Sequence, residues 1–169
     1  EHTRLAARLP GRMERFDLEA GSKRLPVVMD GAHVPFNVRA VLRDLALAHD
    51  LAGPCVAIVA LAADKDAQGF VAELGGRAST IIFTDLPGSS RGRPLAGLKA
   101  IAISLGLTSE VEPDASRALE RGLELSGRAN AWLLVTGSLY LVGALRPAIA
   151  AAAKARAILD LQQASNSLR

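Results

Sequence analysis

The chain has 169 residues, about the length of one domain. Half of its residues are hydrophobic but only 4% are aromatic, so the core must be built from Leu, Val, Ile and Ala, which suits layers of helix and sheet. The net charge of +3 is small and the basic residues form no run, so nothing in the sequence indicates a nucleic-acid-binding protein.

The single cysteine, Cys55, excludes a disulfide within the chain and provides no cysteine cluster for a metal. A reduced, cytoplasmic setting fits this composition. No stretch reaches the roughly 20 uncharged apolar residues that span a bilayer, and no signal peptide is visible, so no membrane association is expected. The chain begins with Glu1 rather than Met, and we therefore expect it to be part of a longer protein.

Short apolar runs alternate along the chain with segments whose apolar residues recur at helical spacing. In chain order, a strand is expected at 27–29, a helix at 36–51, a strand at 55–61, a helix at 67–74, a strand at 80–84, a helix at 95–105, a short strand at 110–112, a helix whose first turn holds Pro113, a strand at 131–136, and a helix from Leu139 to about Gln163. Continuous apolar strands separated by amphipathic helices indicate a parallel sheet covered on both faces. The sequence predicts an α/β fold, a single doubly wound, mostly parallel sheet with helices on both faces.

In open α/β sheets, ligands bind at the carboxyl ends of the strands. The loops there carry "DGAH" (30–33), "ADKD" (63–66), the segment 85–94 and "TGS" (136–138). In the second loop, Asp64 is expected as the N-cap of the next helix and Asp66 in its first turn. The fourth loop, with Thr136, Gly137 and Ser138, is expected to form an anion-binding nest.

Two residues of the "DGAH" loop have alternative roles. Asp30 can accept a hydrogen bond from a ribose hydroxyl, or it can cap the following helix. His33 can contact a phosphate or a substrate carboxylate, or it can be a satisfied polar residue in a turn. Neither a G-x-G-x-x-G fingerprint nor a G-x-x-x-x-G-K-[ST] P-loop occurs in the sequence, which disfavours a dinucleotide-binding redox domain.

Four motifs together resemble a known family. "LPGRME" (9–14), "MDGAH" (29–33), "ADKD" (63–66) and "LLVTGSLYLVG" (133–143) are similar in order and approximate spacing to the C-terminal domain of folylpolyglutamate synthase / dihydrofolate synthase, within the Mur ligase superfamily. The resemblance implies a Rossmann-like C-terminal domain at 16–150, preceded by the remnant of an interdomain linker at 1–15 and followed by a helical extension and tail at 151–169.

The resemblance also implies an ATP-dependent ligase that activates a carboxylate as an acyl phosphate and joins it to an amino group. The expected substrates are glutamate and a folate or pteroate-type acid, and the cofactors are ATP and Mg²⁺, the metal being held by a central P-loop domain of the same longer protein. Arg12 and Asp30 are the implied ATP contacts, and His33 the implied catalytic residue. The isolated domain is expected to be inactive.

One residue departs from the family pattern. The family usually reads D-G-A-H-N-P, and here Val34 stands in place of the asparagine. An apolar side chain can neither donate nor accept a hydrogen bond, so the sequence leaves a second reading open. That reading is a non-catalytic nucleotide-binding or interaction module of the same fold.

Overall fold

A computed structural model describes residues 9–20, 23–51 and 53–166. Six strands form one sheet in the order β1-β2-β6-β3-β4-β5. Their bounds are β1 Glu14–Ala20, β2 Lys23–Met29, β3 Cys55–Val59, β4 Ala78–Phe83, β5 Ser109–Val111 and β6 Trp132–Thr136. Neighbouring strands are parallel except for β1 and β2, which form an antiparallel hairpin at one edge. The predicted mostly parallel α/β sheet is therefore confirmed.

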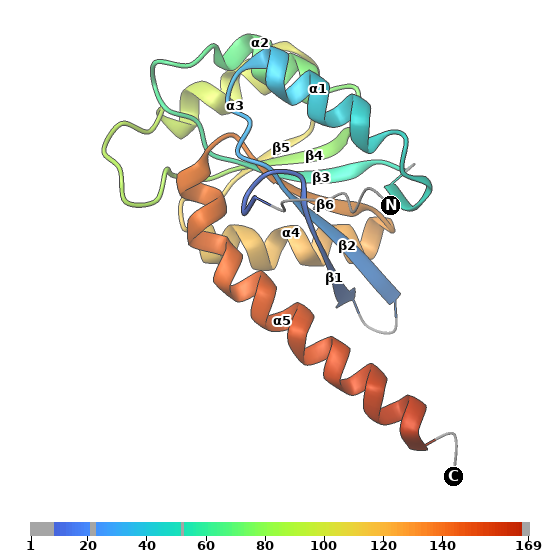
Figure 1. The fold of residues 1–169 in the computed structure, drawn as a ribbon. Helices are drawn as coiled ribbons and strands as arrows, with labels where there is room; N and C mark the ends of the chain where they lie inside the picture. The colour runs from blue at the N-terminus through green and yellow to red at the C-terminus, as the bar shows by residue number, and fades with distance from the viewer. Residues whose placement is uncertain (1–8, 21–22, 52, 167–169) are drawn as a thin grey trace, which may run out of the picture.

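Helices cover both faces of this sheet (Figure 1). Their bounds are α1 Pro35–Leu45, the single 3₁₀ turn η1 His49–Leu51, α2 Ala67–Leu74, α3 Leu95–Ser104, α4 Ala115–Ala129 and α5 Leu139–Asn166. The helices α1, α2 and α3 pack on one face, and α4 and α5 on the other. The last strand, β6, inserts between β2 and β3, so the chain reverses its direction of winding next to the centre of the sheet.

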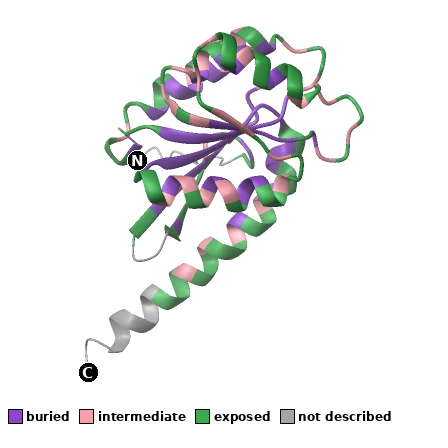
Figure 2. Ribbon diagram, turned by 180° about the vertical axis from the view of Figure 1, so that it is seen from behind, coloured by how far each residue is buried: buried purple, intermediate pink, exposed green. Residues whose placement is uncertain are grey.

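The core consists of two apolar layers separated by the sheet. Every residue of β3 and β6 is buried, as Figure 2 shows for the strands at the centre of the molecule. Strands that are buried on both faces need apolar residues at consecutive positions, which explains the continuous runs in the sequence. The expected apolar face of the first helix is also buried, through Val38, Val41, Leu42 and Leu45.

Several boundaries differ from the expectation. The strand β1 was not predicted. The helix expected over 36–51 ends at Leu45 and is followed by the turn η1. Pro113 precedes the N-cap of α4 instead of lying in its first turn, because Asp114 accepts a hydrogen bond from the Arg117 N–H at 2.9 Å and starts the helix there.

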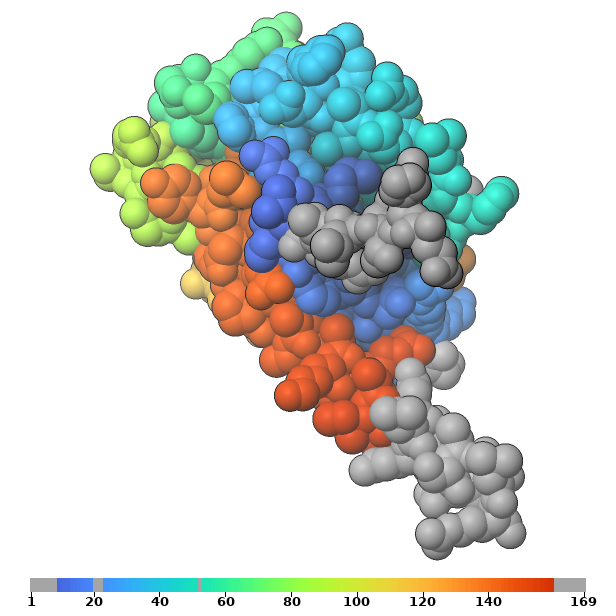
Figure 3. Space-filling model, in the orientation of Figure 1, coloured from blue at the N-terminus to red at the C-terminus, as the bar shows by residue number. Residues whose placement is uncertain are grey.

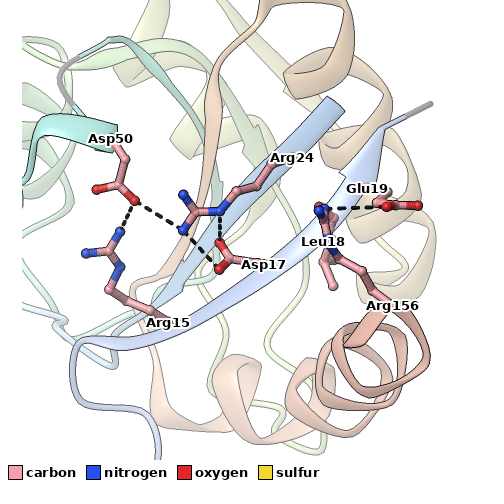
Figure 4. Close-up of polar contacts among 7 residues, drawn as sticks. All are labelled: Arg15, Asp17, Leu18, Glu19, Arg24, Asp50 and Arg156. Carbon is pink, nitrogen blue, oxygen red and sulfur yellow. Dashed lines mark hydrogen bonds and ion pairs between the residues drawn. The ribbon is translucent and has the colours of Figure 1, made fainter. Parts of the chain in front are cut away.

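Ion pairs and α5 hold the edge hairpin in place (Figure 4). On one side, Arg24 contacts Asp17 at 2.8 Å and Asp50 at 3.5 Å, which ties the hairpin to η1. On the other side, Arg156 of α5 donates to the Leu18 carbonyl oxygen at 2.7 Å. The hairpin is thereby fixed to both layers of helices.

The helix α5 is longer than the sheet it covers (Figure 1), and its orange to red part in Figure 3 extends away from the rest of the domain. It runs without interruption through Pro147, so the expected extension at 151–169 continues the same helix as far as Asn166. Of the expected linker at 1–15, residues 1–8 lie outside the described residues, and Glu14 and Arg15 begin β1. Among the described residues, no helix is long and apolar enough to cross a membrane.

Candidate functional site

The strands β2, β6 and β3 end together at one edge of the sheet. Their register pairs Met29 with Val135, and Val59 with Thr136. The loops that follow are joined by backbone hydrogen bonds, since the Asp30 N–H donates to the Val135 carbonyl at 3.0 Å and the Gly137 N–H donates to the Ala32 carbonyl at 2.8 Å. The "DGAH" and "TGS" motifs, about a hundred residues apart in the sequence, are thus direct neighbours.

Asp30 organises this edge through its carboxylate, which is only 3% exposed. Oδ1 accepts a hydrogen bond from the Ala32 N–H at 2.8 Å, and Oδ2 accepts one from the Met13 N–H at 2.9 Å. The alternative that Asp30 caps the next helix is wrong, because the N-cap of α1 is Val34, which makes no side-chain cap bond. Asp30 instead shapes its own loop and attaches the "LPGRME" segment to it.

Arg12 lies in a tight turn at the same edge. Gly11 and Met13, on either side of it, have φ angles of +72° and +47°, a backbone conformation that glycine adopts without strain. The Gly31 N–H donates to the Gly11 carbonyl at 2.9 Å, which fixes the turn against the "DGAH" loop. The Arg12 side chain is exposed and has no hydrogen bond or ion pair within the part of the chain that the structure describes. Its guanidinium remains available to a ligand.

His33 has one ring nitrogen engaged and one available. Its Nδ1 lies 2.9 Å from the Gly31 carbonyl oxygen. Because a carbonyl oxygen only accepts, Nδ1 carries the proton in this hydrogen bond, and the neutral ring then has Nε2 as a free acceptor. The side chain is half-buried and lines a pocket.

The pocket has a volume of about 230 Å³ and collects residues from all the loops at this edge. It is lined by His33, Ala62, Asp64, Lys65, Leu86, Arg91, Gly137, Ser138, Leu139 and Tyr140. Lys65 donates to Asp64 at 2.9 Å, and this hydrogen bond lowers the pKa of the Asp64 carboxyl. With Lys65 and Arg91 on its wall, the pocket suits an anionic group.

The loop 85–94 forms one side of the pocket and supplies Arg91. The sequence analysis predicted no site residue in this loop. Backbone hydrogen bonds join it to the loop after β3, from the Ala63 N–H to the Arg91 carbonyl at 2.9 Å and from the Arg93 N–H to the Leu61 carbonyl at 2.8 Å. The Arg93 guanidinium also donates to the carbonyl oxygens of Ala63 and Lys65. Only this pairing brings Arg91 to the pocket, and no motif in the sequence signals it.

One smaller expectation about these loops is wrong. Asp66, not Asp64, is the N-cap of α2, and its Oδ1 accepts from the Gly69 N–H at 2.9 Å. In the predicted anion nest after β6, the N–H of Gly137 is already engaged. The Gly137 N–H donates to Ala32, and the Tyr140 N–H donates to the Ser138 hydroxyl at 3.0 Å. Ser138 therefore caps the start of α5.

The family model described as Mur ligase, glutamate ligase domain, matches residues 11–139. The chain belongs to this family. The match begins at the Arg12 turn and ends at the first residue of α5, so it includes every element that forms the edge described above.

Relatives in this family are folylpolyglutamate synthases. The chain is 29% identical over 141 residues to the folylpolyglutamate synthase of Lacticaseibacillus casei, covering 83% of this chain and 30% of that protein. Its fold is similar to the Thermotoga maritima folylpolyglutamate synthase (26% identity, TM-score 0.71, 86% of this chain and 31% of that one). It is also similar to the Mycobacterium tuberculosis enzyme complexed with ADP and AMPPCP (25% identity, TM-score 0.72, 85% and 33%).

A further relative is the bifunctional folylpolyglutamate synthase/dihydrofolate synthase of Yersinia pestis complexed with AMPPNP and a Mn ion (26% identity, TM-score 0.66, 85% of this chain and 32% of that one). The chain spans about a third of the length of all these relatives.

Proposed function

We propose that this chain is the C-terminal domain of an ADP-forming ligase that adds glutamate to a folate-type acid. The observation that carries the proposal is the 2.9 Å hydrogen bond from the Met13 N–H to Asp30, which joins the "LPGRME" and "MDGAH" motifs into one site beside a cationic pocket. The names of the relatives support the substrate class, and the nucleotides in two of their structures support ATP as the energy source.

In the proposed reaction, the acid's carboxylate attacks the γ-phosphorus of ATP, ADP leaves, and an acyl phosphate forms. The amino group of glutamate then attacks the acyl carbon, a C–N bond forms, the C–O bond to phosphate breaks, and the nitrogen loses a proton. Phosphoryl transfer of this kind depends on positioning and on charge stabilisation. The residues of this domain fit those two tasks.

Arg12 is the proposed phosphate contact. Its planar, permanently charged guanidinium has no partner among the described residues, and it can donate two hydrogen bonds to phosphate oxygens at once. Asp30 positions Arg12 through the backbone of Met13 and is itself too buried to be the main ligand contact. His33 is the proposed acceptor of the proton lost by the glutamate nitrogen, because its Nε2 is the nitrogen left unprotonated.

The pocket is the proposed site for the carboxylates of glutamate. Lys65 and Arg91 supply positive charge there, and the volume of about 230 Å³ limits the ligand to a small molecule. Mg²⁺ would neutralise charge on the phosphates. Among the described residues, no group of three or more His, Cys, Asp or Glu side chains could hold a metal. We therefore assign the metal and the phosphate-binding loop to another domain of the longer protein.

The alternative, a non-catalytic module, depends on Val34. In the structure this residue is the N-cap of α1, and it is not among the residues that line the pocket. The replacement of asparagine by valine at this position therefore removes a potential helix cap and leaves the pocket wall unchanged. This observation favours the ligase over the non-catalytic module.

The proposal can be tested by NMR on the ¹⁵N-labelled 169-residue chain, titrated separately with Mg·ATP and with glutamate. Mg·ATP should shift the amide signals of Arg12, Gly31 and His33, and glutamate those of Lys65 and Arg91. Because one domain supplies only part of the site, the affinity for Mg·ATP should be no better than about 1 mM, near −4 kcal/mol.

Two variants make this titration specific. Arg12→Ala should remove the Mg·ATP shift at position 12 and leave a weaker one at His33, while Arg43→Ala, which removes an exposed arginine of α1 that does not line the pocket, should leave the shifts unchanged. Shifts scattered over other surfaces, or unaltered by Arg12→Ala, would reject the assignment of this edge as the nucleotide side. Micromolar binding would show that this domain has a complete nucleotide site, and it would contradict the assignment of phosphate and metal binding to another domain.

A further inference from the structure

The Arg12 turn has a third attachment, which comes from α5. Arg146 donates to both carboxylate oxygens of Glu14, from Nη2 to Oε1 at 2.7 Å and from Nε to Oε2 at 2.9 Å. Oε2 of Glu14 also accepts from the Gly11 N–H at 3.1 Å. One carboxylate thus links a helix near the end of the chain to the backbone beside Arg12.

Packing along α5 supports the same contact. Leu139, Val142 and Arg146 are spaced by three and four residues, so they lie on one face of the helix. A Cβ added to Gly11 would meet Val142 Cγ1 at 2.9 Å and Leu139 Cδ2 at 3.5 Å, which shows how closely the turn approaches this face. The turn therefore rests on the first two turns of α5 and is joined to the next one by the ion pair.

The ion pair is only partly exposed to solvent. The side chain of Glu14 is 17% exposed and that of Arg146 is 40% exposed. The hydrogen bonds from Arg146 lower the pKa of the Glu14 carboxyl, so Glu14 is charged near neutral pH. A bidentate pair of this type fixes direction as well as distance, which a single point charge does not.

The helix α5 also forms part of the pocket wall, so the pair lies between the pocket and the Arg12 turn. Its first two residues, Leu139 and Tyr140, line the pocket, and Arg146 lies two turns further along the same helix. The Glu14–Arg146 pair therefore connects the wall of the pocket to the turn that carries Arg12. Asp30 holds the opposite side of that turn through Met13.

We propose that Glu14 and Arg146 are positioning residues for the ligase reaction, which hold the Arg12 turn against α5 and so aim the Arg12 guanidinium at the nucleotide. This inference rests on the proposed function, because it requires Arg12 to contact the nucleotide. The pair acts on Arg12 through the Gly11 N–H and touches no reactant itself. His33 has its own bond to the Gly31 carbonyl oxygen, and Asp30 accepts from the Ala32 N–H in the same loop, so the position of His33 depends less on the pair than that of Arg12 does.

The test compares Arg146→Ala and Arg146→Lys with the unaltered chain by NMR. Without nucleotide, Arg146→Ala should shift the amide signals of Gly11, Arg12 and Met13, and Arg146→Lys should shift them less, because lysine keeps the charge and loses the fork. With Mg·ATP, Arg146→Ala should lose the nucleotide-dependent shift at Arg12 while that at His33 remains. A purely structural role would weaken both shifts equally.

The matched control is Arg128→Ala, which removes an exposed arginine that pairs with Glu124 on α4. It should leave the signals of the Arg12 turn unchanged. Unchanged turn signals in Arg146→Ala, or equal loss at Arg12 and His33, would overturn the inference. The measurements without nucleotide test the attachment alone, whereas absence of any Mg·ATP shift in the unaltered chain would refute the proposed function instead.

Discussion

At the scale of single residues, Asp30 is the clearest link between stability and site geometry. The residue is only 3% exposed, so its side-chain oxygens need hydrogen-bond partners within the protein in place of water. Here the N–H groups of Ala32 and Met13 are these partners, one on each oxygen. The same two bonds bring Arg12 and His33 to one edge.

We expect Asp30→Asn to destabilise the fold by about 1.5–3 kcal/mol, the range for a hydrogen bond to a charged group, because the amide NH₂ cannot accept from the second N–H. The matched control is Asp66→Asn at the exposed N-cap of α2, where asparagine caps as well as aspartate and little change is expected. Urea unfolding of both variants measures the difference. If both variants lost the same free energy of unfolding, the two hydrogen bonds to Asp30 would contribute no more to stability than the single bond to Asp66.

Val34 provides a second prediction at this scale. Its backbone has the extended conformation of an N-cap (φ −133°, ψ 153°), but its side chain cannot accept a hydrogen bond. Val34→Asn should therefore stabilise the chain by about 1 kcal/mol, because asparagine is among the best N-cap residues and valine among the worst. Val34→Ala, which gains no cap, is the control in thermal melting. A destabilised Val34→Asn would show that apolar packing of Val34 outweighs capping.

At the scale of elements, the junction between β6 and α5 makes a close backbone contact in the site. Gly137 has a φ of +96°, and a Cβ at this position would lie 2.5 Å from the Ala60 carbonyl oxygen. The backbone of the residue that follows β3 therefore lies where a side chain would be. This close approach lets the loops after β3 and β6 share one pocket.

Gly137→Ala should accordingly destabilise the chain by more than about 1 kcal/mol, because both the φ angle and the contact with backbone oppose a side chain. Gly143→Ala on the exposed side of α5 meets nothing within 4 Å and should stabilise the helix by about 0.5–1 kcal/mol. Denaturant unfolding of the two variants gives opposite signs if the interpretation is right. A stable Gly137→Ala would indicate that the loop can move away from β3.

The hairpin strand β1 has a sequence pattern typical of a strand, although the sequence analysis did not predict it. In "ERFDLEA", Phe16 and Leu18 alternate with charged residues, which is the period of a half-buried strand. Apart from the short strand at 110–112, the expected strands were continuous apolar runs, the type that is buried on both faces. An edge strand needs only one apolar face, so it has a weaker signal in composition.

At the scale of the whole molecule, the domain places all of its candidate site residues at one edge and contributes cations and a histidine to it. The sequence has no P-loop, and the described residues contain no metal-binding cluster. Phosphoryl transfer needs the phosphates and their charge to be held in place. Under the proposed function, the domain therefore supplies one side of the reaction site.

We expect the purified 169-residue chain to release no ADP from Mg·ATP in the presence of glutamate and a folate acceptor. The Lacticaseibacillus casei folylpolyglutamate synthase, assayed under identical conditions, is the positive control. A coupled assay for ADP measures both. Turnover by the chain alone would refute the assignment of phosphate and metal binding to another domain.

The sequence by itself determined the succession of strands and helices that follows β1, the parallel sheet, and the family resemblance carried by the four motifs. These features are local or periodic, because burial on both faces requires continuous apolar runs and tight turns require particular residues at fixed positions. The identities of Arg12, Asp30 and His33 as candidates also came from motifs that are continuous in the chain.

Only the tertiary structure decided which groups are neighbours and which are free. Asp30 could equally have capped a helix, Arg91 lay in a loop without a motif, and Arg146 is 132 residues from its partner Glu14. Such contacts depend on β6 inserting between β2 and β3 and on α5 crossing the edge hairpin. They are distant in sequence, and local propensity does not encode them, because they form only when the packed layers bring the loops together.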